Sequence, residues 1–146
     1  MPRLSQLMIR IALAWLALGY SFGGLVLSTK GVPLLPWLWA LRSAHIHILL
    51  VGWTVQLAFG VAYWILPRLD AFGNRGNERP VIISALALNS GVMLAVIQSI
   101  AASIAALSTL ARWLPLATGV LYLVAIGLFV RHAWPRVRPF QINPQP

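Results

Sequence analysis

Four long apolar runs constrain the fold of this chain more than any other feature. They fall near residues 8–28, 44–66, 81–107 and 113–132. A bilayer core about 30 Å thick needs roughly 20 apolar residues in a helix, and each run is long enough. Leu, Ala, Ile and Val dominate the runs without strand-like alternation, so helices are the expected spanning form. We therefore predict an all-α membrane protein, with residues 1–146 forming one four-helix bundle and residues 135–146 a flexible tail.

The composition excludes a soluble domain. Hydrophobic residues make up 60% of the chain, and only two residues are acidic, which leaves too little polar surface for a water-exposed globule. The chain has no cysteine, so it can form neither disulfides nor thiolate metal sites, and it cannot attach a c-type haem covalently. Any metal would need histidine, methionine or oxygen ligands.

The basic residues predict an orientation, because Lys and Arg in short loops stay on the cytoplasmic side. With the N-terminus inside, three basic residues lie outside, namely Lys30, Arg42 and Arg112. Eight then lie inside: Arg3, Arg10, Arg68, Arg75, Arg79, Arg131, Arg136 and Arg138. We expect both termini in the cytoplasm of a multi-pass protein of the bacterial inner membrane. The net charge of +9 then reflects this topology and attraction to anionic lipid, and we expect no nucleic-acid binding.

The loops carry turn signals. Residues 29–41 contain two prolines followed by Trp37 and Trp39, which predicts an interfacial segment on the outer face, because indoles favour the headgroup layer. Residues 68–80 read as a connector. A short turn over residues 108–112 would make the third and fourth helices antiparallel neighbours.

Two imidazoles, His45 and His47, stand where the second helix enters the membrane. Metal-ligating groups inside a span are costly and are functional candidates. They are two residues apart, hence about 200° apart around a helix, and cannot bind one iron together. His132 lies at the opposite end of its helix, roughly 30 Å away, and reads as an interfacial residue.

No good second axial ligand for His45 exists within the chain. A two-fold homodimer would solve this, because each copy would contribute one histidine to a shared haem. Gly52 and Gly60 share a broad helix face with His45 and would admit a ring or a partner helix. Arg42 faces the same way and could pair with haem propionates.

Other interpretations of these residues stay open. His45 and His47 could simply hydrogen-bond backbone or headgroups at the interface. His47 could also support a site as a hydrogen-bond donor, although a bond between helices fits its position better. Trp53 could line a haem or quinone pocket, or serve only in packing.

The segment Ser43-Ala44-His45, followed by Gly60, Tyr63 and Pro67, resembles transmembrane helix two of the haem–copper oxidase catalytic subunit, including its nitric oxide reductase relatives. In that family the helix-two histidine is an axial ligand of the low-spin haem, a glycine follows about four turns later, and the helix ends at a proline. Arg42-x-x-His45 is closest to the C-type version. The resemblance assigns the axial-ligand role to His45.

The resemblance covers about 25 residues strongly. The family's other haem ligands, copper histidines and cross-linked tyrosine lie on later helices that this chain lacks, so we do not expect a complete oxidase. His-x-His followed by Gly-Trp is also similar to small multi-pass proteins linked to nitric oxide metabolism.

Three functional hypotheses follow. The first is a small cytochrome that binds haem b through His45 at a homodimer interface and exchanges electrons with quinol or a periplasmic carrier. A bis-imidazole iron has no open position, so it favours electron transfer. The second is a haem-based sensor of nitric oxide, carbon monoxide or oxygen, or a respiratory assembly protein. The third is a non-haem accessory or copper-handling subunit.

Overall fold

The computed structural model of the chain describes residues 1–32, 36–69, 75–102 and 104–137. Every element within these ranges is helical, with no strand. Four stretches are long and apolar enough to cross a membrane, namely Arg3–Gly31, Trp37–Ile65, Arg79–Ala101 and Leu114–Arg136. The predicted all-α fold with four membrane-length helices is confirmed.

The first half of the chain forms two long helical stretches. Helix α1 covers Arg3–Gly31. A 3₁₀ turn, η1 (Pro36–Ala40), leads into α2 (Leu41–His47), the π-helical segment η2 (Ile48–Val55) and α3 (Gln56–Ile65). These last three run on without a break, and we call them together helix two, Leu41–Ile65. Helix two stops where Leu66 turns to ψ 141°, because the residue before a proline is pushed out of the α region.

The second half differs from the prediction at one connection. Helix α4 covers Arg79–Ala101, with Pro80 in its first turn, and α6 covers Leu114–Ala133. The predicted run to residue 107 was wrong, because η3 (Ala105–Leu107) and α5 (Ser108–Ala111) follow α4 as separate turns. The link is therefore longer than the predicted turn at 108–112. Hydropathy cannot locate this end, since the residues beyond Ala101 stay apolar.

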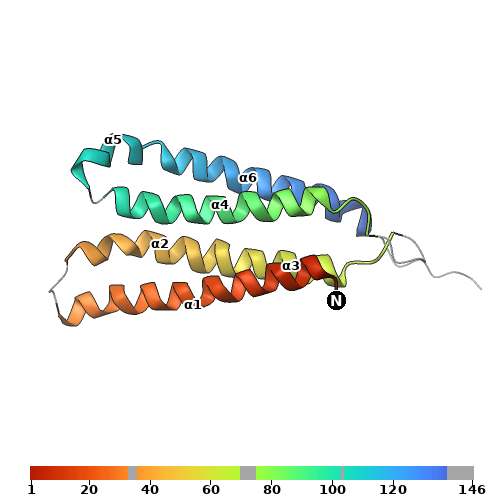
Figure 1. The fold of residues 1–146 in the computed structure, drawn as a ribbon, viewed down its shortest axis with the longest axis horizontal. Coiled ribbons are helices and arrows are strands. Elements are labelled where there is room, and N and C mark those ends of the chain that lie inside the picture. Colours follow the sequence, from red (N-terminus) through yellow and green to blue (C-terminus); the bar gives the residue numbers. More distant parts are fainter. Residues whose placement is uncertain (33–35, 70–74, 103, 138–146) are drawn as a thin grey trace, which may run out of the picture.

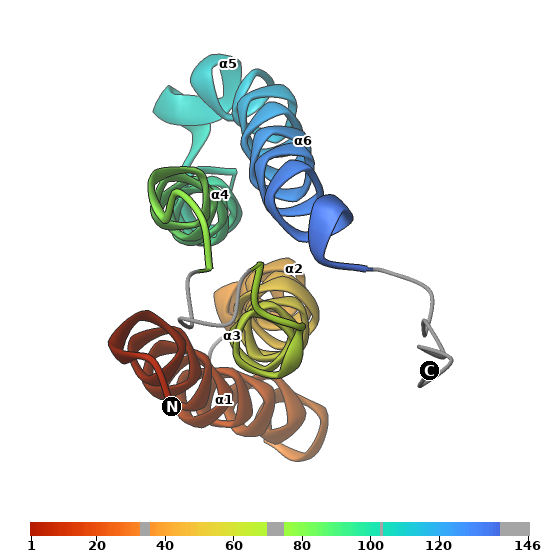
Figure 2. The same cartoon turned by 90° about the vertical axis from the view of Figure 1, so that its right-hand side faces the viewer.

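The helices lie lengthwise beside one another (Figure 1). The end view in Figure 2 places helix two between α1 on one side and the α4–α6 pair on the other. Helices α4 and α6 pack along their lengths as antiparallel neighbours, as predicted. Helix two therefore contacts every other long helix, and its side chains define the centre of the bundle.

Hydrogen bonds between helices reinforce this centre. Trp15 of α1 donates from Nε1 to Oδ1 of Asn89 on α4 over 2.7 Å, and Nδ2 of Asn89 donates to Oε1 of the fully buried Gln56 over 2.7 Å. Ser5 and Ser84 each donate to a carbonyl of a neighbouring helix, on Gly60 and Ala125. Such bonds contribute about 1 kcal/mol each inside a membrane bundle. They orient the helices more than apolar contacts alone can.

The last described turn corrects the predicted flexible tail. Residues Trp134–Arg136 form the 3₁₀ turn η4, and Arg136 is only 1% exposed. Its guanidinium donates to the carbonyls of Tyr63, Leu66 and Pro67 at 3.1, 2.8 and 2.9 Å. A buried cation at the carbonyl end of helix two is favoured by hydrogen bonding and by the helix dipole. The start of the predicted tail was therefore wrong; residues 138–146 lie outside the described part of the chain.

Candidate functional site

The imidazole of His45 packs against α1. A Cβ atom placed on Gly23 would lie 2.7 Å from Cε1 and 3.0 Å from Nδ1 of His45. Only a glycine at this position therefore admits the ring. Nδ1 of His45 lies 2.8 Å from the carbonyl oxygen of Gly19, one turn earlier in α1.

This contact determines the tautomer of His45. A backbone carbonyl can only accept a hydrogen bond, so Nδ1 must carry the proton and donate it. In a neutral ring the other nitrogen, Nε2, then holds the free lone pair. A histidine whose Nδ1–H is bonded to a carbonyl is the usual arrangement for metal ligation through Nε2.

A cavity of about 210 Å³ lies beside this ring. It is lined by Gly23, Val26, Leu27 and Lys30 of α1, by Trp39 of η1, and by Arg42 and His45 of α2. Its wall is mainly apolar, and its two cations, Lys30 and Arg42, carry no acidic neighbour in the lining. The cavity therefore combines an apolar wall with two cations and the imidazole of His45.

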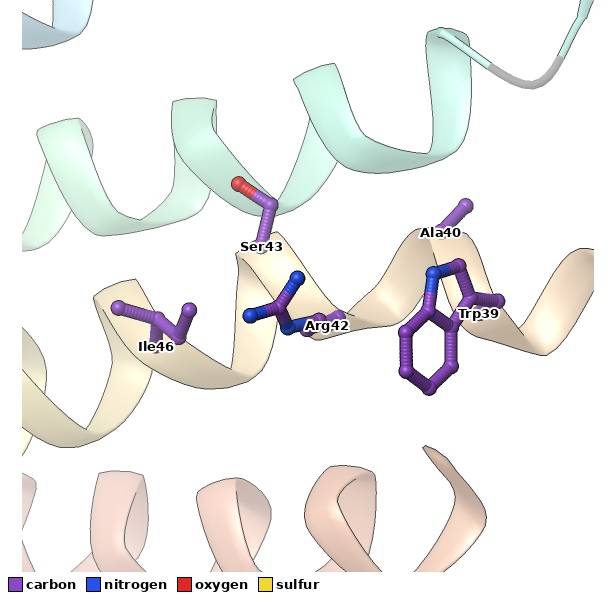
Figure 3. Close-up of a pocket in the computed structure, with 5 residues that line it drawn as sticks. All are labelled: Trp39, Ala40, Arg42, Ser43 and Ile46. Carbon is purple, nitrogen blue, oxygen red and sulfur yellow. The ribbon is translucent and has the colours of Figure 1, made fainter. Parts of the chain in front are cut away.

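Arg42 lines the same cavity as His45. Its guanidinium carbon lies 5.7 Å from the ring centre of Trp39. Both residues also line a second, open hollow of about 360 Å³ with Ala40, Ser43 and Ile46. Figure 3 shows these side chains following one another along η1 and α2. The exposed guanidinium thus stands between two hollows near the same helix end.

His47 points away from the site. Its Nδ1 lies 3.3 Å from the hydroxyl oxygen of Tyr122 on α6, with ring centres 5.9 Å apart. His45 contacts α1 and His47 contacts α6, on opposite sides of helix two (Figure 2). The two imidazoles therefore point toward different helices, and His47 makes a contact between helix two and α6.

Gly52 and Gly60 lie on the same face of helix two as His45, and α1 covers that face. A Cβ on Gly52 would come within 2.9 Å of the Trp15 ring, and one on Gly60 within 3.0 Å of Ile9. Both glycines therefore serve the packing of α1 within the chain. Trp53 is half-buried and packs against the same central core. None of these three residues lines the cavity beside His45.

His132 lies at the other end of the bundle. Its Nε2 accepts a hydrogen bond from Nη1 of Arg136 over 3.3 Å, and its ring lies 5.6 Å from that of Tyr63. Tyr63 in turn donates from its hydroxyl to Glu78 over 2.5 Å. No group of three or more His, Cys, Asp or Glu side chains suited to a metal ion lies within the described ranges.

Sequence reasoning missed the glycines that seat His45. Gly19 and Gly23 are four residues apart in an apolar helix, which is the Gly-x-x-x-Gly pattern of close helix contact in membranes. That pattern could have indicated the contact face of α1. It could not have indicated that the contacting group is an imidazole. The π-helical segment that begins at Ile48 also had no sequence signal; such segments are frequent beside functional sites.

Comparison of the chain with protein-family models, with curated protein sequences and with solved structures gives no match.

Proposed function

We propose that this chain is a membrane-embedded b-type haem protein that transfers electrons, with Nε2 of His45 as an axial ligand of haem b. The single observation that carries the proposal is the hydrogen bond from Nδ1 of His45 to the Gly19 carbonyl. It holds the ring in one tautomer and one orientation, with its ligating nitrogen free. The resemblance of this segment to helix two of haem–copper oxidases supports the same role.

The surroundings of His45 fit a haem. Val26, Leu27 and Trp39 would contact the apolar macrocycle, while Lys30 and Arg42 would pair with its propionates at the helix ends. When bound, the haem would supply an iron that accepts and releases one electron. The protein's own contribution is to orient the imidazole, to neutralise the propionates and to exclude water from the apolar side of the ring.

The size of the cavity supports a site shared between two chains. Ligand pockets usually enclose roughly 300–1,000 Å³, and the cavity beside His45 has about 210 Å³. One chain therefore covers only part of a haem. The other two histidines point to α6 or lie at the opposite end. We propose that a second copy, related by a two-fold axis, covers the other side and contributes its own His45 as sixth ligand.

The proposed setting is the bacterial inner membrane, with both termini in the cytoplasm and the His45 end at the periplasmic side. The support is the charge distribution, because six of the eleven basic residues lie at residues 68–79 and 131–138. Near the periplasmic end of the bundle, the haem could exchange electrons with quinol in the bilayer or with a periplasmic carrier.

A second candidate function rests on the lining of the cavity, to which His45 contributes but His47 and His132 do not. If no second copy supplies a ligand, the haem iron keeps an open position. Such a haem could bind nitric oxide, carbon monoxide or oxygen and act as a sensor or in respiratory assembly. The two proposals differ in coordination number, which optical spectra distinguish.

The experiment is a reduced-minus-oxidised optical spectrum of the detergent-purified protein, with a pyridine haemochrome measurement of haem per chain. Sharp α and β bands with half a haem per chain support the shared bis-histidine site. One haem per chain with a spectrum that shifts on adding carbon monoxide supports the sensor. A colourless protein that takes up no added haem would overturn both and favour the accessory or copper-handling hypothesis.

A further inference from the structure

The end of the bundle opposite His45 holds a second polar hollow, of about 220 Å³. The connector before α4 contributes Leu69, Arg75, Gly76 and Asn77, and the first turn of α4 contributes Pro80. The last turn of α6 contributes Arg131 and His132, and η4 contributes Pro135. Two arginines and a histidine thus line one hollow, and no acidic side chain is among the described residues of its lining. Phosphate oxygens are the natural ligands of such a set, since guanidinium groups match them in charge and geometry.

The charge around the hollow is strongly positive. The chain's only acidic residues are Asp70 and Glu78, and the described carboxylate, that of Glu78, accepts the hydroxyl hydrogen of Tyr63. Buried Arg136 lies directly behind His132 and bonds to neutral carbonyls and to the His132 ring. Within the described part of the chain, dipoles therefore balance its charge, while the carboxylate of Glu78 acts on His132. An anion in the hollow would gain from the net positive charge of the three arginines Arg75, Arg131 and Arg136.

An unpaired hydrogen-bond donor on Arg75, which lines the hollow, is an independent reason to expect a bound anion. The Nε–H of Arg75 is buried and has no hydrogen-bond partner among the described residues. The same side chain is held in place, with Nη2 3.5 Å from the carbonyl of Trp64 and its guanidinium carbon 5.9 Å from the ring centre of Tyr63. A buried donor without a partner is uncommon and calls for an acceptor that the described residues do not supply.

We infer that this hollow binds the phosphate of an anionic phospholipid headgroup. The position favours a lipid over a soluble phosphate, because Arg131 and His132 belong to the last turn of a membrane-length helix. Side chains in that turn are expected at the depth of the lipid headgroups. Basic pockets between the ends of membrane helices bind anionic headgroups in this way. Because the charged side chains among the described lining residues are all basic, a headgroup of net negative charge is preferred over a zwitterionic one.

The test uses native mass spectrometry of the detergent-purified full chain, titrated with phosphatidylglycerol, with phosphatidylcholine or with inorganic phosphate. We expect phosphatidylglycerol to bind about fivefold or more tightly than phosphatidylcholine. Arg131→Gln should lower that affinity about fivefold, the contribution of one arginine near a headgroup. Arg68→Gln is the matched control, because Arg68 is exposed at the same end but does not line the hollow. It should change the affinity less than twofold.

Arg131 is exposed and Arg75 is half-buried, so Arg131→Gln tests the hollow with the smaller risk to folding, and thermal unfolding of both variants checks this. Equal losses in Arg131→Gln and Arg68→Gln would overturn the hollow as a site and leave only diffuse attraction. Equal affinity for the two lipids would overturn the charge preference. Inorganic phosphate that displaces phosphatidylglycerol at equal concentration would overturn the assignment to a lipid.

Discussion

His45 of α2 donates a hydrogen bond from Nδ1 to the carbonyl oxygen of Gly19 in α1, over 2.8 Å. The ring can reach this carbonyl because Gly23, one turn further along α1, has no side chain to block it. Two glycines thus hold an imidazole in one tautomer between two membrane helices. The proposed haem site follows from this relationship, and the first two predictions test it.

We expect His45→Ala to abolish haem retention, because the substitution removes the proposed axial ligand. His47→Ala should leave the haem content unchanged, since His47 contacts Tyr122 on the other side of helix two. His132→Ala, at the opposite end, should also leave it unchanged. Pyridine haemochrome assays of the three purified variants provide the measurement. A His45 variant with full haem content would disprove the central claim.

Gly23→Ala should disturb the same site without touching the ligand. The new methyl group would lie 2.7 Å from Cε1 of His45, so the ring must move and its bond to Gly19 must lengthen. We expect a lower haem content or a shifted α band. Gly24→Ala is the matched control, because a Cβ there meets nothing within 4 Å. Identical spectra for the two variants would show that the seating of the ring does not matter.

The proposed orientation can be tested by labelling, since the chain contains no cysteine. Lys30→Cys near the His45 end should react with a membrane-impermeant maleimide in intact cells. Arg68→Cys should react only after the inner membrane is opened. The expectation follows from the distribution of basic residues. The opposite pattern would place His45 and the proposed haem site at the cytoplasmic side.

Asn89→Ala should lower the free energy of unfolding by about 1–2 kcal/mol, because Trp15 and Gln56 both lose a partner for a buried polar group. Ser90→Ala changes the exposed neighbour and should have an effect below about 0.5 kcal/mol. Unfolding in mixed detergent micelles measures both values. A neutral Asn89→Ala variant would mean that these bonds do not stabilise the bundle.

Arg136→Gln should be more harmful, lowering the free energy of unfolding by about 2–4 kcal/mol, since hydrogen bonds from a charged group to the last carbonyls of helix two are lost. Arg136→Lys should recover little, because an ammonium cannot reproduce the fork of a guanidinium. The same unfolding assay applies, with Arg68→Gln as the exposed control. Full recovery by lysine would show that charge alone matters.

The amino-acid sequence by itself determined that this is a membrane protein with four long helices, and that His45 and His47 point in opposed directions. These depend on local quantities: the length of each apolar run, the rise per residue and the angle between side chains on one helix. The same quantities placed Arg42 beside His45. They did not predict the end of α4 at Ala101, because the residues beyond it are still apolar.

Only the tertiary structure decided which helix covers which face. Gly52 and Gly60 share a face with His45, but that α1 covers this face depends on how Trp15, Met8 and Ile9 fit against them. Likewise, Arg136 follows the last long helix in a proline-containing segment and reads as the start of a loose tail, yet it caps helix two. Both outcomes arise from contacts between residues more than 30 positions apart, which local hydropathy and spacing cannot encode.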